Sequence, residues 1–137
     1  MKNVMSDVTR NRELISEFEE SRAPGGFRHA DHVRMAFAYV SEFPLLEAIA
    51  KFSAAIKRFA AAQGKPHLYH QTITWAYLML IHDRMARAGM PQSWEAFAEV
   101  NSDLLVWGGG VLELFYTRAT LDSDLARQTF LFPDRGR

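Results

Sequence analysis

Apolar residues recur every three or four positions through most of the chain, a spacing that places them on one face of an α-helix. Glycine and proline residues interrupt this pattern and divide it into successive segments. The pattern predicts helices over 12–21, 30–41, 44–63 and 68–88, a fifth capped by Ser93, a short one over 111–116, and a last one from Asp122 or Ser123 to 130. No segment alternates as a half-buried strand does. The predicted fold class is therefore all-α, a compact single-domain bundle of four to five main helices with a short C-terminal helix.

Two segments stand out in this pattern. The segment over 68–88 is apolar around most of its circumference, with a narrow polar strip at Thr72, Asp83, Arg84 and Arg87. A helix of that kind is typical of the centre of a bundle. We expect residues 1–10 to be a loosely ordered N-terminus.

Composition narrows the classes of function. The chain has 137 residues, with 16 Lys and Arg balanced by 16 Asp and Glu, and it has no Cys. The chain has no excess of positive charge, and this argues against a nucleic-acid partner. The longest nearly apolar run is about half the length of a membrane span, so no membrane partner is predicted. No signal peptide is visible at the N-terminus, and we expect a cytoplasmic protein.

The five histidines are grouped. His29 and His32 form one H-x-x-H pair, His67 and His70 form another, and His82 follows on the same predicted helix as the second pair. Residues three apart on a helix are neighbours on its surface, so each pair can present two imidazoles to one point. Both pairs fall on the apolar side of their predicted helices. The sequence therefore predicts a buried histidine site near two helix starts.

Two kinds of chemistry suit such a site. In one, His29, His32 and His70 bind a divalent transition metal (Zn, Fe, Cu or Ni) that leaves a position open for water. In the other, no metal is bound and one histidine is a general base that acts on a small molecule. Three polar residues are candidates for orienting the imidazoles or for sharing the catalysis, namely Thr74, Tyr77 and Asn101. No Glu stands three residues before any histidine, which argues against a ferritin-like di-iron centre.

A different class of function remains open. The histidines can be structural residues that satisfy backbone groups at helix starts, in a non-enzymatic module that binds a small ligand or another protein. The near-zero charge and the apolar segment over 68–88 also make a homo-oligomer a candidate state.

Two motifs carry a resemblance to a known family. The sequence contains Phe27-x-His29-x-Asp31-His32-Val33-Arg34-x-Ala36 and Tyr69-His70-x-Thr72-x-Thr74-x-Ala76, and it closes on Ser123-x-x-Ala126-Arg127 with Pro133-Asp134. These stretches resemble a family of small bacterial all-helical proteins, over most of the chain from Phe27 to Asp134. The resemblance implies an all-helical fold and attaches no activity or cofactor. It emphasises His29, Asp31, His32, His70, Thr72 and Thr74, while His67 and His82 lie outside the shared pattern.

Overall fold

The chain folds as an all-α domain in the computed structural model, which describes residues 4–20, 28–90, 92–106 and 110–135. Five helices have seven or more residues in this described part: α1 (Val4–Glu19), α2 (His29–Glu42), α3 (Leu45–Ala62), α4 (Gln71–Ala88) and α5 (Trp94–Val100). Shorter elements complete the chain, namely the 3₁₀ turns η1 (Pro66–Leu68), η2 (Ser102–Leu105) and η3 (Val111–Leu114) and the helices α6 (Arg118–Leu121) and α7 (Asp124–Gln128). None of the described residues forms a strand. The predicted all-α fold class is confirmed.

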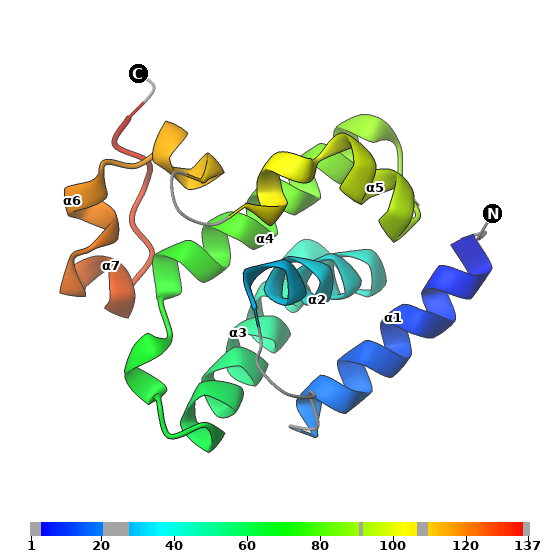
Figure 1. Cartoon of the computed structure of the whole chain (residues 1–137), viewed down its shortest axis with the longest axis horizontal. Helices are drawn as coiled ribbons and strands as arrows, with labels where there is room; N and C mark the ends of the chain where they lie inside the picture. The colour runs from blue at the N-terminus through cyan, green and yellow to red at the C-terminus, as the bar shows by residue number, and fades with distance from the viewer. Residues whose placement is uncertain (1–3, 21–27, 91, 107–109, 136–137) are drawn as a thin grey trace.

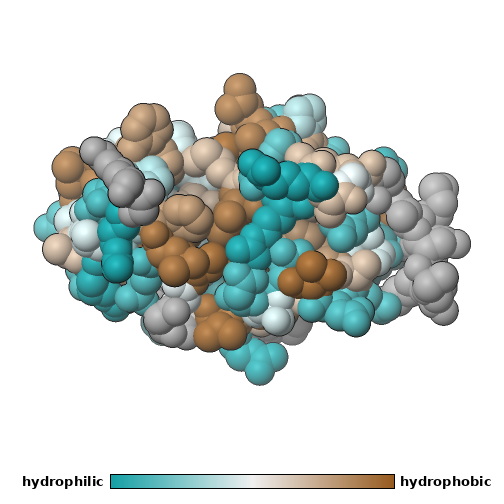
Figure 2. Space-filling view, turned by 90° about the horizontal axis from the view of Figure 1, so that it is seen from above, coloured by the Kyte–Doolittle hydropathy of each residue, from teal (hydrophilic) through white to brown (hydrophobic). Residues whose placement is uncertain are grey.

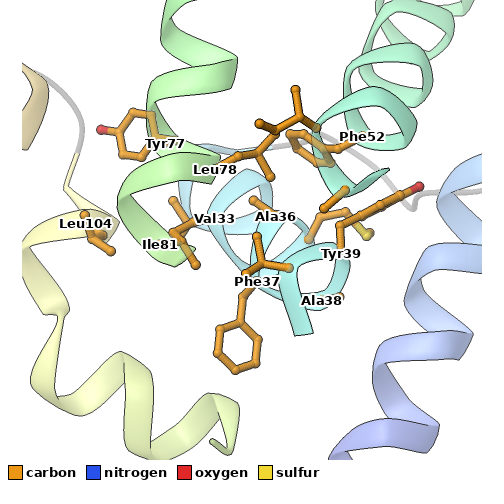
Figure 3. Close-up of a cluster of buried hydrophobic side chains, with 14 of the residues drawn as sticks. Val33, Ala36, Phe37, Ala38, Tyr39, Phe52, Tyr77, Leu78, Ile81 and Leu104 are labelled. Carbon is orange, nitrogen blue, oxygen red and sulfur yellow. The ribbon is translucent and has the colours of Figure 1, made fainter. Parts of the chain in front are cut away.

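The core surrounds α2, which packs against α1, α3, α4 and η2 (Figure 1). Every residue from Met35 to Val40 is buried, so this helix has no solvent-facing side along its second half. Figure 3 shows side chains from the neighbouring elements, including Phe52, Leu78 and Leu104, around those of α2. Burial of each large apolar side chain contributes about 1.5–3 kcal/mol. The sequence predicts a central position for the segment over 68–88, but α2 is the more completely buried helix.

The first helix begins earlier than the sequence predicts. It starts at Val4 rather than at residue 12, so residues 4–10, expected to be loosely ordered, are helical. Its inward face includes the polar residues Asp7 and Asn11, which are only 4% and 2% exposed. Asn11 accepts a hydrogen bond from Arg34 of α2 at 2.9 Å. The bond between Asn11 and Arg34 contributes to holding this face of α1 against α2.

The start of α4 also differs from the prediction. Residues 66–68 form η1, and His70 is the N-cap that precedes the helix at Gln71. His67 and His70 are therefore not neighbours on one helix face. Proline in the first turn of η1 and the extended backbone at Tyr69 separate them.

The C-terminal segment after α5 is attached to α4 by buried polar contacts. Thr72, which the sequence places on a polar strip, is 0% exposed. Its hydroxyl donates to the carbonyl of Thr129 at 2.7 Å and accepts from the N–H of Leu131 at 3.2 Å. Tyr116 donates to the carbonyl of Leu131 at 2.7 Å. The tail that follows α7 therefore lies along the bundle as a fixed segment.

Two further parts of the helix pattern differ. The fifth helix has the predicted N-cap at Ser93 and ends at Val100, which is 77% exposed. The predicted helix over 111–116 is the short turn η3, and the last predicted helix is α7 preceded by α6. No helix among the described residues has the length and apolar character needed to cross a membrane.

We expect the substitution Thr72→Val to destabilise the fold by about 1–3 kcal/mol, because it leaves the Thr129 carbonyl and the Leu131 N–H without their partner while it preserves shape. Urea unfolding followed by circular dichroism measures the loss. Thr129→Val is the matched control, since the bond uses only the backbone of Thr129, whose side chain is exposed. Equal stability of the two variants would contradict the role of the Thr72 hydroxyl.

Candidate functional site

A pocket of about 520 Å³ opens beside the starts of α2 and α4. Its wall is formed by residues of α2, α3, the segment 68–70, α4 and α7, namely His29, His32, Val33, Ala36, Phe52, Ile56, Leu68, Tyr69, His70, Ile73, Thr74, Tyr77 and Arg127. The volume is in the range of small-molecule sites, which are mostly apolar with a few polar groups. Five of the six residues predicted from the sequence thus line one pocket.

His29 is fixed at the first position of α2 by a contact with η2. Its Nε2 lies 2.8 Å from the carbonyl oxygen of Leu104. A carbonyl oxygen only accepts hydrogen bonds, so Nε2 carries the proton and the neutral ring has its lone pair at Nδ1. Burial lowers the pKa of His29, although the bond to Leu104 opposes this effect. The ring also lies edge-on to Tyr77, with the two ring centroids 5.1 Å apart.

His70 uses both ring nitrogens within the fold. Nδ1 accepts the N–H of Ile73 at 3.1 Å, and Nε2 donates to the carbonyl of Leu121 at 2.7 Å. The imidazole therefore caps α4 and holds the end of α6 at the same time. Burial lowers the pKa of His70, and the charge of Arg127 lowers it further, against the opposing effects of the Leu121 bond and Asp122. This side chain is a structural member of the pocket wall.

The remaining predicted residues divide into two groups. Thr74 and Tyr77 project from α4 into the pocket wall, and burial raises the pKa of Tyr77 to about 12, so that its hydroxyl is a neutral donor and acceptor. His32 lines the same pocket from α2. Asn101 does not line it. Its amide donates to the carbonyl of Phe97 at 2.9 Å and accepts from Arg84 at 3.0 Å, which stabilises the end of α5.

The three predicted metal ligands do not form a metal centre. No three His, Asp or Glu side chains are arranged to hold an ion in the part of the chain that the structure describes. His70 has no nitrogen to offer, since both are engaged by the backbone of Ile73 and Leu121. The Nε2 of His29 is likewise held by Leu104. His29, His32 and His70 therefore share a pocket wall, and the described part of the structure does not support the prediction that they bind a metal.

Arg127 is the main residue of the pocket that the sequence argument missed as a site residue. It reaches the pocket from α7, and its guanidinium donates to the carbonyl of His67 at 3.3 Å. A second, smaller pocket of about 160 Å³ adjoins the first and shares His70, Ile73, Tyr77 and Arg127 with it. The available signal was the closing motif Ser123-x-x-Ala126-Arg127, but its distance along the chain gave no sign of contact with the histidines.

The outer surface also has hydrophobic side chains in contact with solvent. Figure 2 shows brown hydrophobic residues between teal hydrophilic ones on the face seen from above. Several large apolar residues are more than half exposed, including Leu46, Leu114 and Phe132. The structure holds a single chain, so a homo-oligomer stays a prediction from the sequence.

We expect His29 and His70 to be neutral Nε2–H tautomers at pH 7.5, because each donates from Nε2 to a carbonyl and burial lowers the pKa of each. Long-range ¹H–¹⁵N correlation spectra of the imidazoles measure this directly. An imidazolium or an Nδ1–H tautomer at either residue would contradict the hydrogen bonds described.

The same two pKa shifts predict weaker folding in acid. Between the lowered folded pKa and the ordinary value of 6.5, the unfolded chain binds more protons than the folded one at His29 and His70. The free energy of unfolding should therefore fall as the pH decreases from 7.5 to 5.5. Chemical unfolding at both pH values measures the slope. His70→Gln should have a shallower slope than the wild-type protein; a flat wild-type profile would refute the assignment.

Comparisons of the chain with models of known protein families, with curated proteins and with solved structures gave no match.

Proposed function

We propose that the protein binds a small, largely apolar molecule that carries an anionic group, in the pocket of about 520 Å³ between α2, α3 and α4. The observation that supports this most directly is the composition of the wall. Val33, Phe52 and Ile56 are among the apolar residues of three helices that line it, and Arg127 lies at the edge toward α7. No Asp or Glu belongs to the described residues that line this pocket.

The polar groups of the wall suit such a ligand. With the pKa of His29 and His70 lowered, the imidazoles are neutral near pH 7 and add no charge to the pocket. Arg127 then carries the permanent positive charge of the pocket wall. A guanidinium can bind a carboxylate or phosphate through two parallel N–H donors. Thr74 and Tyr77 offer hydroxyl groups nearby for further hydrogen bonds. The apolar surface would supply affinity, and these groups would supply orientation.

Three matched probes test this function. We expect 3-phenylpropanoate to bind more tightly than 3-phenylpropanol and 3-phenylpropylammonium, measured as dissociation constants from NMR titration of the pocket resonances. Arg127→Gln should weaken binding of the carboxylate about threefold to tenfold, and it should leave the alcohol unaffected. Arg87→Gln is the control, because Arg87 is an exposed arginine paired with Asp83 outside the pocket. Equal affinity for all three probes would show that charge plays no part, and the absence of saturable binding would refute the proposal.

A second proposed function is proton transfer at His29, and the tautomer of this residue favours it. Donation to Leu104 holds the ring in one orientation with the basic lone pair at Nδ1, and the lowered pKa keeps the ring unprotonated near neutral pH. A fixed neutral imidazole in a pocket has the properties of a general base. On this proposal Nδ1 accepts a proton from an acidic C–H of the ligand and returns it to the same carbon.

Deuterium exchange tests the proton transfer. The probe is 4-phenyl-2-oxobutanoate in D₂O, whose C–H groups beside the ketone exchange through an enolate. The wild-type protein should accelerate exchange at least about 100-fold relative to His29→Gln, because glutamine retains a donor for Leu104 but has no basic nitrogen. Equal exchange rates would leave His29 with a structural role alone.

A further inference from the structure

Another cavity, separate from the histidine pocket and from the smaller pocket beside it, lies at the other end of α2. It has a volume of about 270 Å³ and is lined by residues of α1, the end of α2, α4 and the connection to α5, namely Asp7, Val8, Asn11, Ser41, Glu42, Met85, Met90 and Gln92. Figure 1 shows the N-terminal half of α1 beside this end of α2. None of these residues lines the histidine pocket, so the cavity is a separate feature.

Three buried polar atoms on residues that line this cavity have no hydrogen-bond partner among the described residues: Asp7 Oδ2, Ser41 Oγ and Gln92 Oε1. Asp7 is only 4% exposed. An unpaired buried polar atom costs about 1–3 kcal/mol, and more when the group is charged. In the described part of the chain, the three residues that carry a buried side-chain oxygen without a partner all line this one cavity. Such a concentration indicates a site whose occupant completes the hydrogen bonds.

The charge of the cavity favours a cationic occupant. Two carboxylates line it, those of Asp7 and Glu42, and no Lys, Arg or His belongs to its described lining. Glu42 is already engaged, because Arg12 donates to one oxygen at 3.2 Å and Asn11 to the other at 3.4 Å. The carboxylate of Asp7 has no such neighbour at Oδ2.

Arg34 lies near this carboxylate but is committed elsewhere. Its guanidinium donates to Asn11 at 2.9 Å and lies over the ring of Trp94, 5.3 Å from the centroid. Burial lowers the pKa of Arg34 to about 10, and the charge of Asp7 opposes this effect. The positive charge of Arg34 thus offsets part of the negative charge of Asp7, but Arg34 forms no hydrogen bond with Asp7 Oδ2.

We propose that this cavity binds the primary ammonium group of a small aliphatic amine. An ammonium group has three N–H donors, which matches the three unpartnered oxygens of Asp7, Ser41 and Gln92. The alkyl part would lie against the apolar side of the lining, formed by Val8, Met85 and Met90. The cavity has the volume of several water molecules, at about 30 Å³ each, which is sufficient for a short alkyl chain.

An inorganic cation fits this lining less well. Divalent ions such as Mg²⁺ and Ca²⁺ bind through about six or more oxygen ligands at short distance. Here both oxygens of Glu42 are used by other side chains, and three of the lining residues are apolar. The lining therefore resembles a site for an organic cation with a polar head and an apolar tail.

NMR titration of the full chain with n-butylammonium chloride tests the proposal. We expect saturable shifts at residues 7, 41 and 92 and a dissociation constant at least about tenfold lower than for n-butanol or tetramethylammonium, which lack the charge or the N–H donors. Asp7→Asn should raise the constant for n-butylammonium about tenfold or more. Asp124→Asn makes the same change on an exposed position of α7 and should leave it unaffected.

Three outcomes would overturn the proposal. The first is the absence of saturable binding in the wild-type protein, with the cavity filled by water alone. The second is equal binding of n-butanol, which would show an apolar cavity without a cation site. The third is saturation by MgCl₂ or NaCl at lower concentration than by n-butylammonium, which would assign the oxygens to an inorganic ion. Ser41→Ala, which removes one of the three oxygens and retains the carboxylate, keeps the test valid if Asp7→Asn does not fold.

Discussion

The start of α4 depends on the imidazole of His70, and much of the remaining structure depends on the start of α4. One ring nitrogen accepts the N–H of Ile73, and the other donates to the carbonyl of Leu121. The first bond satisfies one of the backbone donors that every helix leaves free in its first turn. The second attaches the end of α6, more than 50 residues later in the sequence, to the same point. Two residues after His70, Thr72 binds the backbone at Thr129 and Leu131, and Trp75 of α4 stacks on Phe130, so both polar and aromatic contacts hold the C-terminal segment along α4.

The histidine pocket and the cavity lined by Asp7 lie at opposite ends of α2 and have opposite electrostatic character. The cavity at the start of the helix has Arg127 in its wall and no acidic side chain among its described lining residues. The cavity at its end has Asp7 and Glu42 and no basic side chain among its described lining residues. The zero net charge of the whole chain conceals this separation. A balance of charges over a sequence excludes a large one-sided field, but it does not exclude small sites of either sign.

The sequence predicted the fold class and most main helices because their apolar residues recur at helical spacing, as in the segment over 30–41, which is α2 within two residues at its ends. It also brought five of six site residues to one pocket, since the positions of His29, His32, Thr74 and Tyr77 depend mainly on helix faces. The sequence did not predict the roles of side chains that bind backbone groups. His70 was placed on a helix, although it is the cap, and Asn101 was placed in the site, although it binds Phe97 and Arg84. The motif positions Asp31 and Thr72 likewise bind backbone groups, at Arg28 and at Thr129 and Leu131. The bonds to Leu121, Thr129 and Leu131 join residues more than 50 positions apart, and bonds of that kind have no period in the sequence.

The hydrogen bonds of the histidines also limit what chemistry the pocket can perform. An imidazole can act as a base only through a nitrogen that is not already an acceptor or a donor to the fold. By this criterion His70 has no catalytic nitrogen, because both of its ring nitrogens bind the backbone; the bond to Leu104 places the proton of His29 on Nε2. Proton transfer at the pocket would therefore depend on an imidazole from α2, while the imidazole before α4 keeps the wall in place. If the pocket binds a ligand through its apolar wall and Arg127, as proposed, any chemistry would depend on where that binding places the ligand relative to α2.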